Sequence, residues 1–324
     1  MATDPAARAT RSAWGRAAGA AIASLLVGGT IWLAGAKEVI DLVVHVEPAS
    51  IALAFGAAFG SLLCRGLRLS LLLPPKRLAV LPAAPVSAAA QAAALFVPAR
   101  LGELALPWLL HRQLGFDTAS GVATLLAART LDTAALGIWS IIAIGARGTT
   151  QSPLILVGGL ALISTLVLIP AMVALIDGWF APRAARWGDM AARWSDRLHR
   201  VRRGLDVVRQ RPLRLTGAAA ACVASWAFQW TLAWCLLAAM GFRWPAWDVV
   251  TGSAVASLSN LLPINLVANI GTLEAGWTAA FTALGVPLET AAATGLATHL
   301  WALVIAALFG GAGWFLLGQP ENRR

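Results

Sequence analysis

Two short stretches place a glutamate in apolar surroundings, shortly after a proline and a glycine. The first, Val97–Leu104 (VPARLGEL), carries Glu103, and the second, Leu262–Gly276 (LPINLVANIGTLEAG), carries Glu274. Proline and glycine interrupt a membrane helix, and the freed backbone groups then need polar partners. A carboxylate at membrane depth is costly, so each glutamate is a candidate for ion coupling or for contact with a charged substrate.

The other candidate residues form pairs with helical spacing. Arg129 and Asp132 are three residues apart on one helix face and can pair, and Arg100 and Glu103 have the same spacing. One interpretation is a structural ion-pair cluster. The other leaves an arginine available for an anionic head group, and both can hold because a guanidinium has five donors that suit phosphate. The candidate substrate-binding residues are Arg100, Glu103, Arg129, Asp132, Asn269 and Glu274.

The two glutamates are expected to differ in role. Arg100 is close to Glu103 in sequence and favours a fixed ion pair, whereas no basic residue lies near Glu274 between Val249 and Glu289. A neighbouring positive charge favours the ionised carboxylate, and burial disfavours it. Glu274 is therefore the better candidate for protonation. If the halves of the chain are symmetric repeats, both glutamates should face one cavity.

Composition places these residues in a membrane protein. Of the 324 residues, 59% are hydrophobic and 12% are charged, and runs of roughly 20 apolar residues, enough to cross a bilayer, recur along the chain. Leu78–Leu110 and Trp247–Leu284 are apolar but interrupted by the two stretches above. Complete spans are expected over Ala17–Ala36, Ser50–Leu73, Thr118–Ala146, Pro153–Ile176, Leu215–Met240 and Glu289–Leu317.

Basic residues set the orientation of these spans. Ten arginines and three aspartates lie between Gly178 and Arg214, a net charge of +7 out of +10 for the whole chain. The positive-inside rule makes this loop cytoplasmic, together with both termini and the basic residues at positions 76–77 and 111–112. All of these basic segments can be cytoplasmic if each interrupted segment returns to the side of the membrane from which it entered.

The expected fold is therefore an all-α polytopic membrane protein with six spanning helices and two re-entrant helical hairpins. The halves 17–146 and 153–317 then have opposite orientation and form an inverted-topology repeat, within a single membrane domain over 1–324. The alternative is eight or more full spans with kinks.

The basic stretch 178–214 has one apolar face. Residues at spacings of three and four alternate with arginines, which is typical of an amphipathic helix on a membrane surface that binds anionic lipid head groups. Anchoring of the topology and capture of lipid are both compatible with this pattern. Nucleic acid is not an expected partner. The apolar positions are Trp187, Met190, Trp194, Leu198, Val201, Leu205 and Val208.

Several classes of site are not expected. The three cysteines and four histidines have no metal-ligand spacing, so neither a metal nor another cofactor is predicted. No Walker motif is present, and the predicted outer loops are too short for the acidic clusters of a lipid-modifying enzyme. A transporter is thus favoured over an enzyme.

The ordered set Pro98-x-Arg100-x-Gly102-Glu103, Arg129-x-x-Asp132, then Pro263 and Gly271-x-x-Glu274 resembles the lysylphosphatidylglycerol synthase transmembrane family, also called flippase-like domain proteins. The family usually has a glutamate at the position of Ala128. The resemblance implies a multi-pass protein of the bacterial cell inner membrane that lacks the aminoacyl-transferase domain of bifunctional relatives.

The function expected from this resemblance is translocation of a lipid, or of a lipid-linked anionic head group, between leaflets. The partner would be a membrane phospholipid or a polyprenyl-linked lipid, and assembly into a homo-oligomer stays open. The alternative is a non-transporting scaffold or accessory subunit of a lipid or cell-envelope biosynthesis complex. Leaflet exchange in proteoliposomes separates the two.

Overall fold

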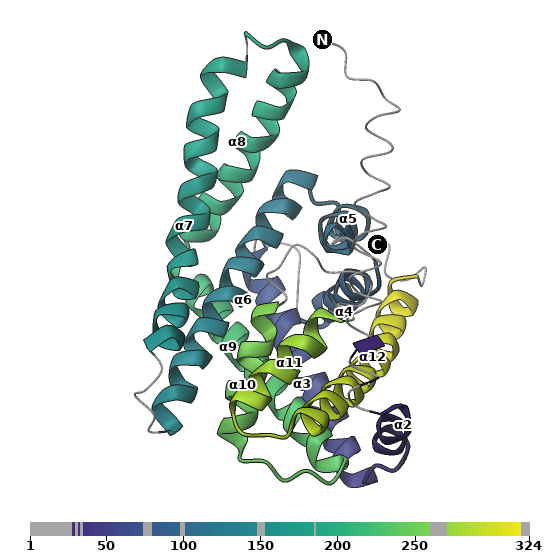
Figure 1. The fold of residues 1–324 in the computed structure, drawn as a ribbon. Helices are drawn as coiled ribbons and strands as arrows, with labels where there is room; N and C mark the ends of the chain where they lie inside the picture. The colour runs from purple at the N-terminus through teal and green to yellow at the C-terminus, as the bar shows by residue number, and fades with distance from the viewer. Residues whose placement is uncertain are drawn as a thin grey trace, which may run out of the picture.

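The computed structural model describes residues 28–29, 32, 35–73, 80–97, 101–147, 153–184, 186–259 and 271–318. Within these ranges the regular structure is helical throughout, as the sequence predicted. The helices form one bundle from which a helical hairpin projects (Figure 1). Arg100 and Asn269, and most of the predicted first span, lie outside the described residues.

Five helices of the described part are long and apolar enough to cross a membrane. Each coincides with a predicted span, so the chain is a multi-pass membrane protein. Proline in the first turn, where no N–H is needed, begins both α3 and α9. The five helices are α3 (Pro48–Leu72), α6 (Thr118–Arg147), α7 (Pro153–Ala184), α9 (Pro212–Ala239) and α12 (Leu288–Gly318).

The two interrupted segments each form a helix, a break and a second helix. The first gives α4 (Val80–Phe96), the 3-10 turn η1 (Leu101–Leu104) and α5 (Ala105–Leu114). The second gives α10 (Ala246–Leu258) and α11 (Thr272–Ala283). The longest of these helices has 17 residues, short of the roughly 20 that cross a bilayer.

After each break the chain packs back onto the helix that it has just left. A Cβ on Gly102 would lie 1.8 Å from the carbonyl oxygen of Ala93 in α4, so only glycine allows this approach. In the second half a Cβ on Gly276 would lie 3.0 Å from Ser259, at the end of α10. Both segments therefore double back at the same place, beside their glutamate.

Helices of one half pack on helices of the other in a reciprocal pattern. α4 lies against α12, and α10 lies against α6. In the same way, α2 (Ala36–Val44) of the first half packs on α12, and α8 (Asp189–Arg209) of the second half packs on α6. Exchanging the halves, so that α3 matches α9, α4 matches α10 and α6 matches α12, therefore reproduces these contacts, although α6 packs on α9 without an equally extensive contact of α12 with α3.

The helices α3 and α9 cross at equivalent residues. Ser61 and Ser225 are the fourteenth residues of their helices, and their hydroxyl oxygens are 3.0 Å apart. Each hydroxyl also donates to the backbone carbonyl of the other residue, at 3.2 and 3.5 Å. Such self-complementary contact is what a two-fold relation produces. α3 and α9 are the central pair of the bundle.

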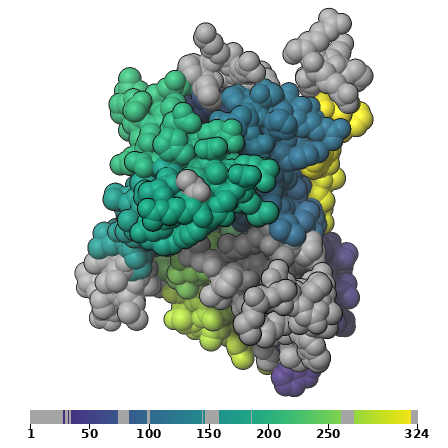
Figure 2. All heavy atoms as spheres, turned by 90° about the horizontal axis from the view of Figure 1, so that it is seen from above, coloured from purple at the N-terminus to yellow at the C-terminus, as the bar shows by residue number. Residues whose placement is uncertain are grey.

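The basic stretch 178–214 contains the helix that its apolar spacing predicted. Its first residues complete α7, its last residues begin α9, and α8 lies between them, side by side with α7 (Figures 1 and 2). The apolar face of α8 is divided. Val201 and Leu205 are buried against α6 and α9, whereas Trp187, Met190 and Trp194 are exposed.

One buried carboxylate fastens this hairpin. Asp177 of α7 is 2% exposed, and its Oδ2 lies 3.1 Å from both Nδ1 of His199 and Nη1 of Arg202 in α8. The predicted span ended at Ile176, but the helix continues to Ala184 because Asp177 is paired across the hairpin instead of meeting solvent. At about 1.5 Å per residue, the 32 residues of α7 exceed the roughly 30 Å hydrocarbon core.

Candidate functional site

Asp132 of α6 is the centre of a buried polar cluster. Its Oδ1 accepts hydrogen bonds from Nη1 of Arg68 in α3, at 2.5 Å, and from the thiol of Cys222 in α9, at 3.2 Å. Asp132 and Arg68 are both less than 10% exposed. Cys222 also lies 3.4 Å from Nη1 of Arg68. Three spanning helices are thus joined by ionised or strongly polar groups inside the bundle.

Arg129 connects this cluster to the first break. Its Nε donates to Oε2 of Glu103 in η1, at 3.1 Å, and its Nη1 is 4.0 Å from Oδ2 of Asp132. Arg129 and Asp132 thus lie together as their spacing predicted, whereas Glu103, which was expected to pair with Arg100, has Arg129 as a partner. The side chain of Arg129 is 45% exposed, against 10% for that of Arg68. Arg129 is therefore more accessible to an external group than Arg68.

The cluster carries a positive surplus. Arg65 in α3 donates through Nε to Ser61, at 3.5 Å, and is close enough to Asp132, Arg68 and Arg129 to interact with them electrostatically. Three arginines therefore face two carboxylates, those of Asp132 and Glu103, among the described residues of the cluster. A net charge of +1 inside an apolar bundle is unfavourable unless an anion approaches it.

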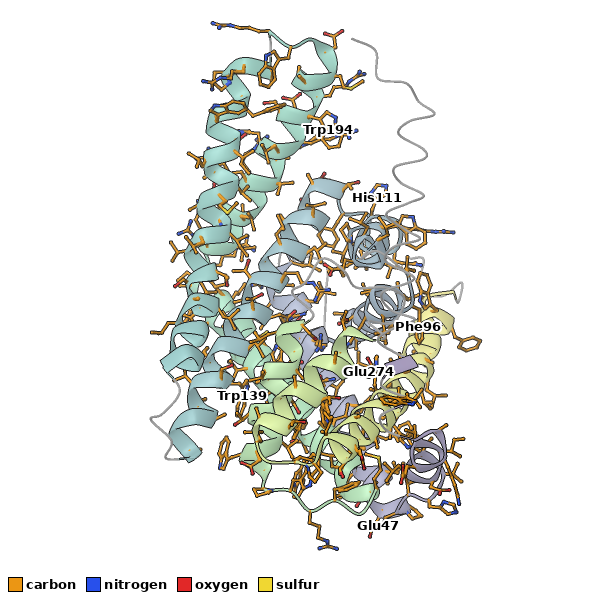
Figure 3. The ribbon with its side chains drawn as sticks, in the orientation of Figure 1. Glu47, Phe96, His111, Trp139, Trp194 and Glu274 are labelled. Carbon is orange, nitrogen blue, oxygen red and sulfur yellow. The ribbon has the colours of Figure 1, made fainter. Side chains whose placement is uncertain are left out.

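Glu274 forms a second acid–base pair, in the other half of the chain. It is 1% exposed, and its Oε1 is 2.6 Å from Nδ1 of His299 in α12. Its Oε2 accepts the N–H of Gly271, at 2.7 Å, which caps α11. Figure 3 shows Glu274 inside the bundle. No basic residue is near Glu274 in the sequence, but the fold supplies His299 as a partner, which corrects the expectation that it lies apart from a base.

The two pairs occupy matching places. Each consists of a glutamate just after a helix break and a base on the last long helix of its half. The partners are 26 residues apart for Glu103 and Arg129 and 25 residues apart for Glu274 and His299. The base is an arginine in the first pair and a histidine in the second.

Comparison with known protein families assigns the chain to one of them. A family model described as the lysylphosphatidylglycerol synthase transmembrane region matches residues 17–310. The chain belongs to this family. No curated protein matches it in sequence.

The residues that suggested the lysylphosphatidylglycerol synthase transmembrane family have different outcomes in the structure. Glu103, Arg129 and Asp132 lie together, and Glu274 lies with His299. Arg100 and Asn269 fall outside the described residues, so their predicted places in the site stay predictions. Ala128, at the position where the family usually has a glutamate, is buried in the apolar core between α6, α8 and α9.

Sequence reasoning missed Arg65, Arg68, Cys222 and His299 as members of these clusters. Arg65 and Arg68 interrupt the apolar run of α3 at a spacing of three, and intramembrane arginines signal a functional or paired site. That signal was available. His299 lies in the predicted span Glu289–Leu317 and gave a signal of the same kind. Cys222 gave none, because its partner Asp132 is 90 residues away.

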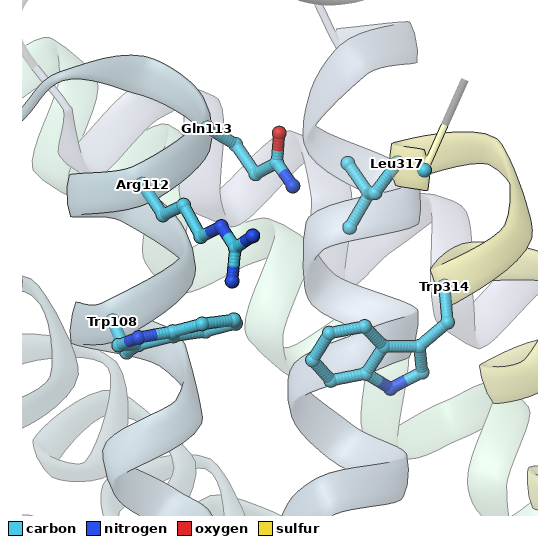
Figure 4. A pocket seen from close by; sticks show the side chains of 6 residues that line it. Trp108, Arg112, Gln113, Trp314 and Leu317 are labelled. Atoms are coloured by element: carbon cyan, nitrogen blue, oxygen red, sulfur yellow. The ribbon is translucent and has the colours of Figure 1, made fainter. Parts of the chain in front are cut away.

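A cavity of about 430 Å³ lies where α5 and α12 end (Figure 4). The rings of Trp108 and Trp314 are 6.0 Å apart, and the guanidinium of Arg112 lies 5.1 Å above the Trp108 ring. Gln113 and Leu317 complete its wall. Aromatic rings beside a cation are typical of a membrane interface.

Proposed function

We propose that the chain carries the phosphate-bearing head group of a membrane phospholipid or polyprenyl-linked lipid between leaflets. The observation that carries this proposal is the positive surplus formed by Arg65, Arg68 and Arg129 around Asp132 and Glu103. An anionic head group would balance that charge, and guanidinium geometry suits phosphate. The acyl chains would stay in the lipid.

The arginines of this cluster would have different tasks. Arg68 is buried and bonded to Asp132, which suits a structural role. Arg129 is nearly half exposed, and its two carboxylate contacts use only part of its five donors. Arg129 would therefore bind the passing phosphate, and Glu103 would hold the guanidinium in place between passages.

The architecture that we infer is an inverted repeat with two re-entrant hairpins. Three observations support it. The helices of the interrupted segments are short, both segments double back at Gly102 and Gly276, and contacts between the halves are reciprocal. Transporters of this kind place their sites at such broken helices and rock one repeat against the other.

The orientation follows from the basic residues. His111 and Trp194 lie toward one end of the molecule and Glu47 lies at the other (Figure 3). We assign the end with His111, Arg112 and the arginines of α8 to the cytoplasm. The termini would be on the same side, and the membrane would be the bacterial inner membrane.

The second acid–base pair would couple transport to protons. With Nδ1–H donated to Glu274, the pair carries one negative charge while the imidazole is neutral, and none once its other nitrogen is protonated. The pair of Glu103 with Arg129 has an arginine where this pair has a histidine. The first half of the chain would thus hold the substrate, and the pair of Glu274 with His299 in the second half would change its charge when a proton binds.

Leaflet exchange in proteoliposomes tests the proposal. The vesicles contain the purified chain and a fluorescent phosphatidylglycerol or polyprenyl phosphate, and dithionite reports the fraction in the outer leaflet over time. Arg129→Gln should slow exchange by about tenfold or more, because a hydrogen-bonded charge is lost, and Arg129→Lys should slow it less. Arg193→Gln, on the exposed face of α8, is the matched control.

The same assay at several pH values tests the coupling. Glu274→Gln keeps an oxygen for the N–H of Gly271 but removes the negative charge beside His299, so it should alter the pH dependence, whereas Glu289→Gln on the exposed first turn of α12 should not. A parent-like pH profile for Glu274→Gln would contradict the coupling alone. Exchange no faster than in protein-free vesicles, for both lipids, would overturn the transport function and favour the scaffold.

A further inference from the structure

A second cavity, of about 380 Å³, lies where α8 crosses the ends of three spanning helices. Its wall includes Leu72, the last residue of α3, and residues from the first turns of α6 and α9. Helices α3, α6 and α9 are all candidate spans. Their common end marks the level of a membrane surface, so this cavity lies where lipid head groups lie.

Four arginines converge on this cavity from two helices. Arg200 and Arg203 come from α8, and Arg211 and Arg214 come from the start of α9. Within each pair the residues are three apart, and like charges at this spacing repel one another. Asp117 is the carboxylate among the described lining residues, so the wall carries a surplus of three positive charges.

The existing contacts do not balance this charge. Arg214 donates through Nη1 to the backbone carbonyl of Leu73, at 3.2 Å. Asp117 is engaged in capping α6, where its oxygens accept the N–H groups of Ala119 and Ser120. A phosphate would balance the charge, since guanidinium groups bind it with two parallel hydrogen bonds each.

Most of the other lining residues are apolar, apart from Ser120 and Thr124. Leu72, Val208 and Leu215 form part of its wall, and Leu213, next to Arg214 in the chain, is 87% exposed. A free anion gains nothing from such surfaces, whereas a phospholipid offers both a charged phosphate and an apolar glycerol ester. The cavity lies within the size range of sites for small ligands.

We propose that this cavity binds the phosphate of an anionic membrane phospholipid, with its ester region against Leu72 and Leu215. The lipid would join α8 to the spanning helices at the membrane surface. This site is separate from the cluster around Asp132. The proposal does not depend on the proposed function, because a resident lipid can be bound here whether or not the chain moves lipids.

Binding of short-chain lipids to the full chain in neutral detergent tests the site. Titration calorimetry with dihexanoyl phosphatidylglycerol should show binding, and dihexanoyl phosphatidylcholine and inorganic phosphate should bind much more weakly. The double variant R200Q/R203Q should weaken binding of dihexanoyl phosphatidylglycerol by about tenfold or more, because charged hydrogen bonds are lost. R193Q/R197Q, which removes the same charge from the same helix outside the cavity, should bind like the parent.

The proposal is wrong if dihexanoyl phosphatidylglycerol does not bind to the parent, or if R200Q/R203Q and R193Q/R197Q weaken its binding equally. It is also wrong if inorganic phosphate binds as tightly as the lipid. The variant R200K/R203K guards against misfolding, because it keeps the charge while losing the paired guanidinium hydrogen bonds. It should bind more weakly than the parent with an unchanged melting temperature, and parent-like affinity would also contradict the site.

Discussion

At the scale of single residues, Asp132 is the side chain on which most contacts depend. Its replacement by alanine leaves Arg68 buried without its carboxylate. Breaking a buried ion pair in this way costs about 3–5 kcal/mol. We expect Asp132→Ala to lower the melting temperature of the purified protein clearly, whereas Asp196→Ala, on the exposed face of α8, should change it little.

A double variant distinguishes a lost pair from a general packing defect. Arg68→Leu combined with Asp132→Leu removes both charges, and replacing a whole buried pair by apolar groups is often neutral or stabilising. The double variant should therefore melt at a higher temperature than Asp132→Ala. If it melts lower, the cluster does not act through its charges.

Asp117 gives the fold a dependence on pH. Burial raises the pKa of this carboxyl, but hydrogen bonds from the Ser120 hydroxyl and from the N–H groups of Ala119 and Ser120, together with nearby Arg200, outweigh it, so the pKa is lowered. A lowered pKa means that the charged form stabilises the folded state. That contribution is complete above the unfolded pKa, about 4, and is lost as the pH falls through the folded pKa.

The substitution Asp117→Asn tests this effect. Asparagine caps a helix about as well as aspartate but does not titrate. The parent should therefore lose stability relative to Asp117→Asn as the pH is lowered below about 4, as measured by thermal unfolding. Asp117→Ala should cost about 1 kcal/mol at neutral pH. Parallel pH profiles for the parent and Asp117→Asn would show that the carboxylate makes no net contribution.

Local spacing predicted one part of the site and could not predict the rest. Arg129 and Asp132 are three residues apart in one helix, so their spacing alone predicts that they lie close together. The partners Arg68 and Cys222 come from other helices, and their meeting depends on how α3, α6 and α9 pack. A sequence pattern carries no direct information about such packing.

At the scale of elements, the helix ends were largely predictable because proline and glycine mark them. Pro48 and Pro212 begin helices, and Gly115, with φ of 64°, ends α5. The end of α7 was not predictable. Pro182 lies within its last turn, and the partners of Asp177 come from α8, more than 20 residues later.

Gly102 is the residue on which the first hairpin depends. A methyl group there would meet the backbone of α4, which cannot move aside as a side chain can. We expect Gly102→Ala to destabilise the protein by about 1–3 kcal/mol and to displace Glu103. Gly56→Ala, in α3 with nothing within 4 Å of the new Cβ, should be close to neutral in the same melting experiment. Equal effects would mean that η1 can shift freely.

At the scale of the whole molecule, the distribution of charge fixes the orientation that the proposals require. A reporter fused after Arg200, in the middle of α8, should behave as cytoplasmic. A second reporter fused at Glu47, at the opposite end of the molecule (Figure 3), should behave as periplasmic. The reverse result at both positions would invert the proposed orientation of the halves and place the arginine-lined cavity on the outer surface.

The packing of α4 on α12 has a consequence for how the protein is made. Gly310 and Gly313 of α12 lie against Ala92 and Pro85 of α4, which leaves no room for larger side chains. α4 is synthesised before the surface that covers it, because α12 begins about 190 residues after the end of α4. A nascent chain therefore holds α4 in the membrane without its partner until α12 has been made. Premature termination anywhere before Leu288 produces a chain whose first hairpin lacks this cover, which is the kind of exposed surface that membrane proteases and insertases inspect.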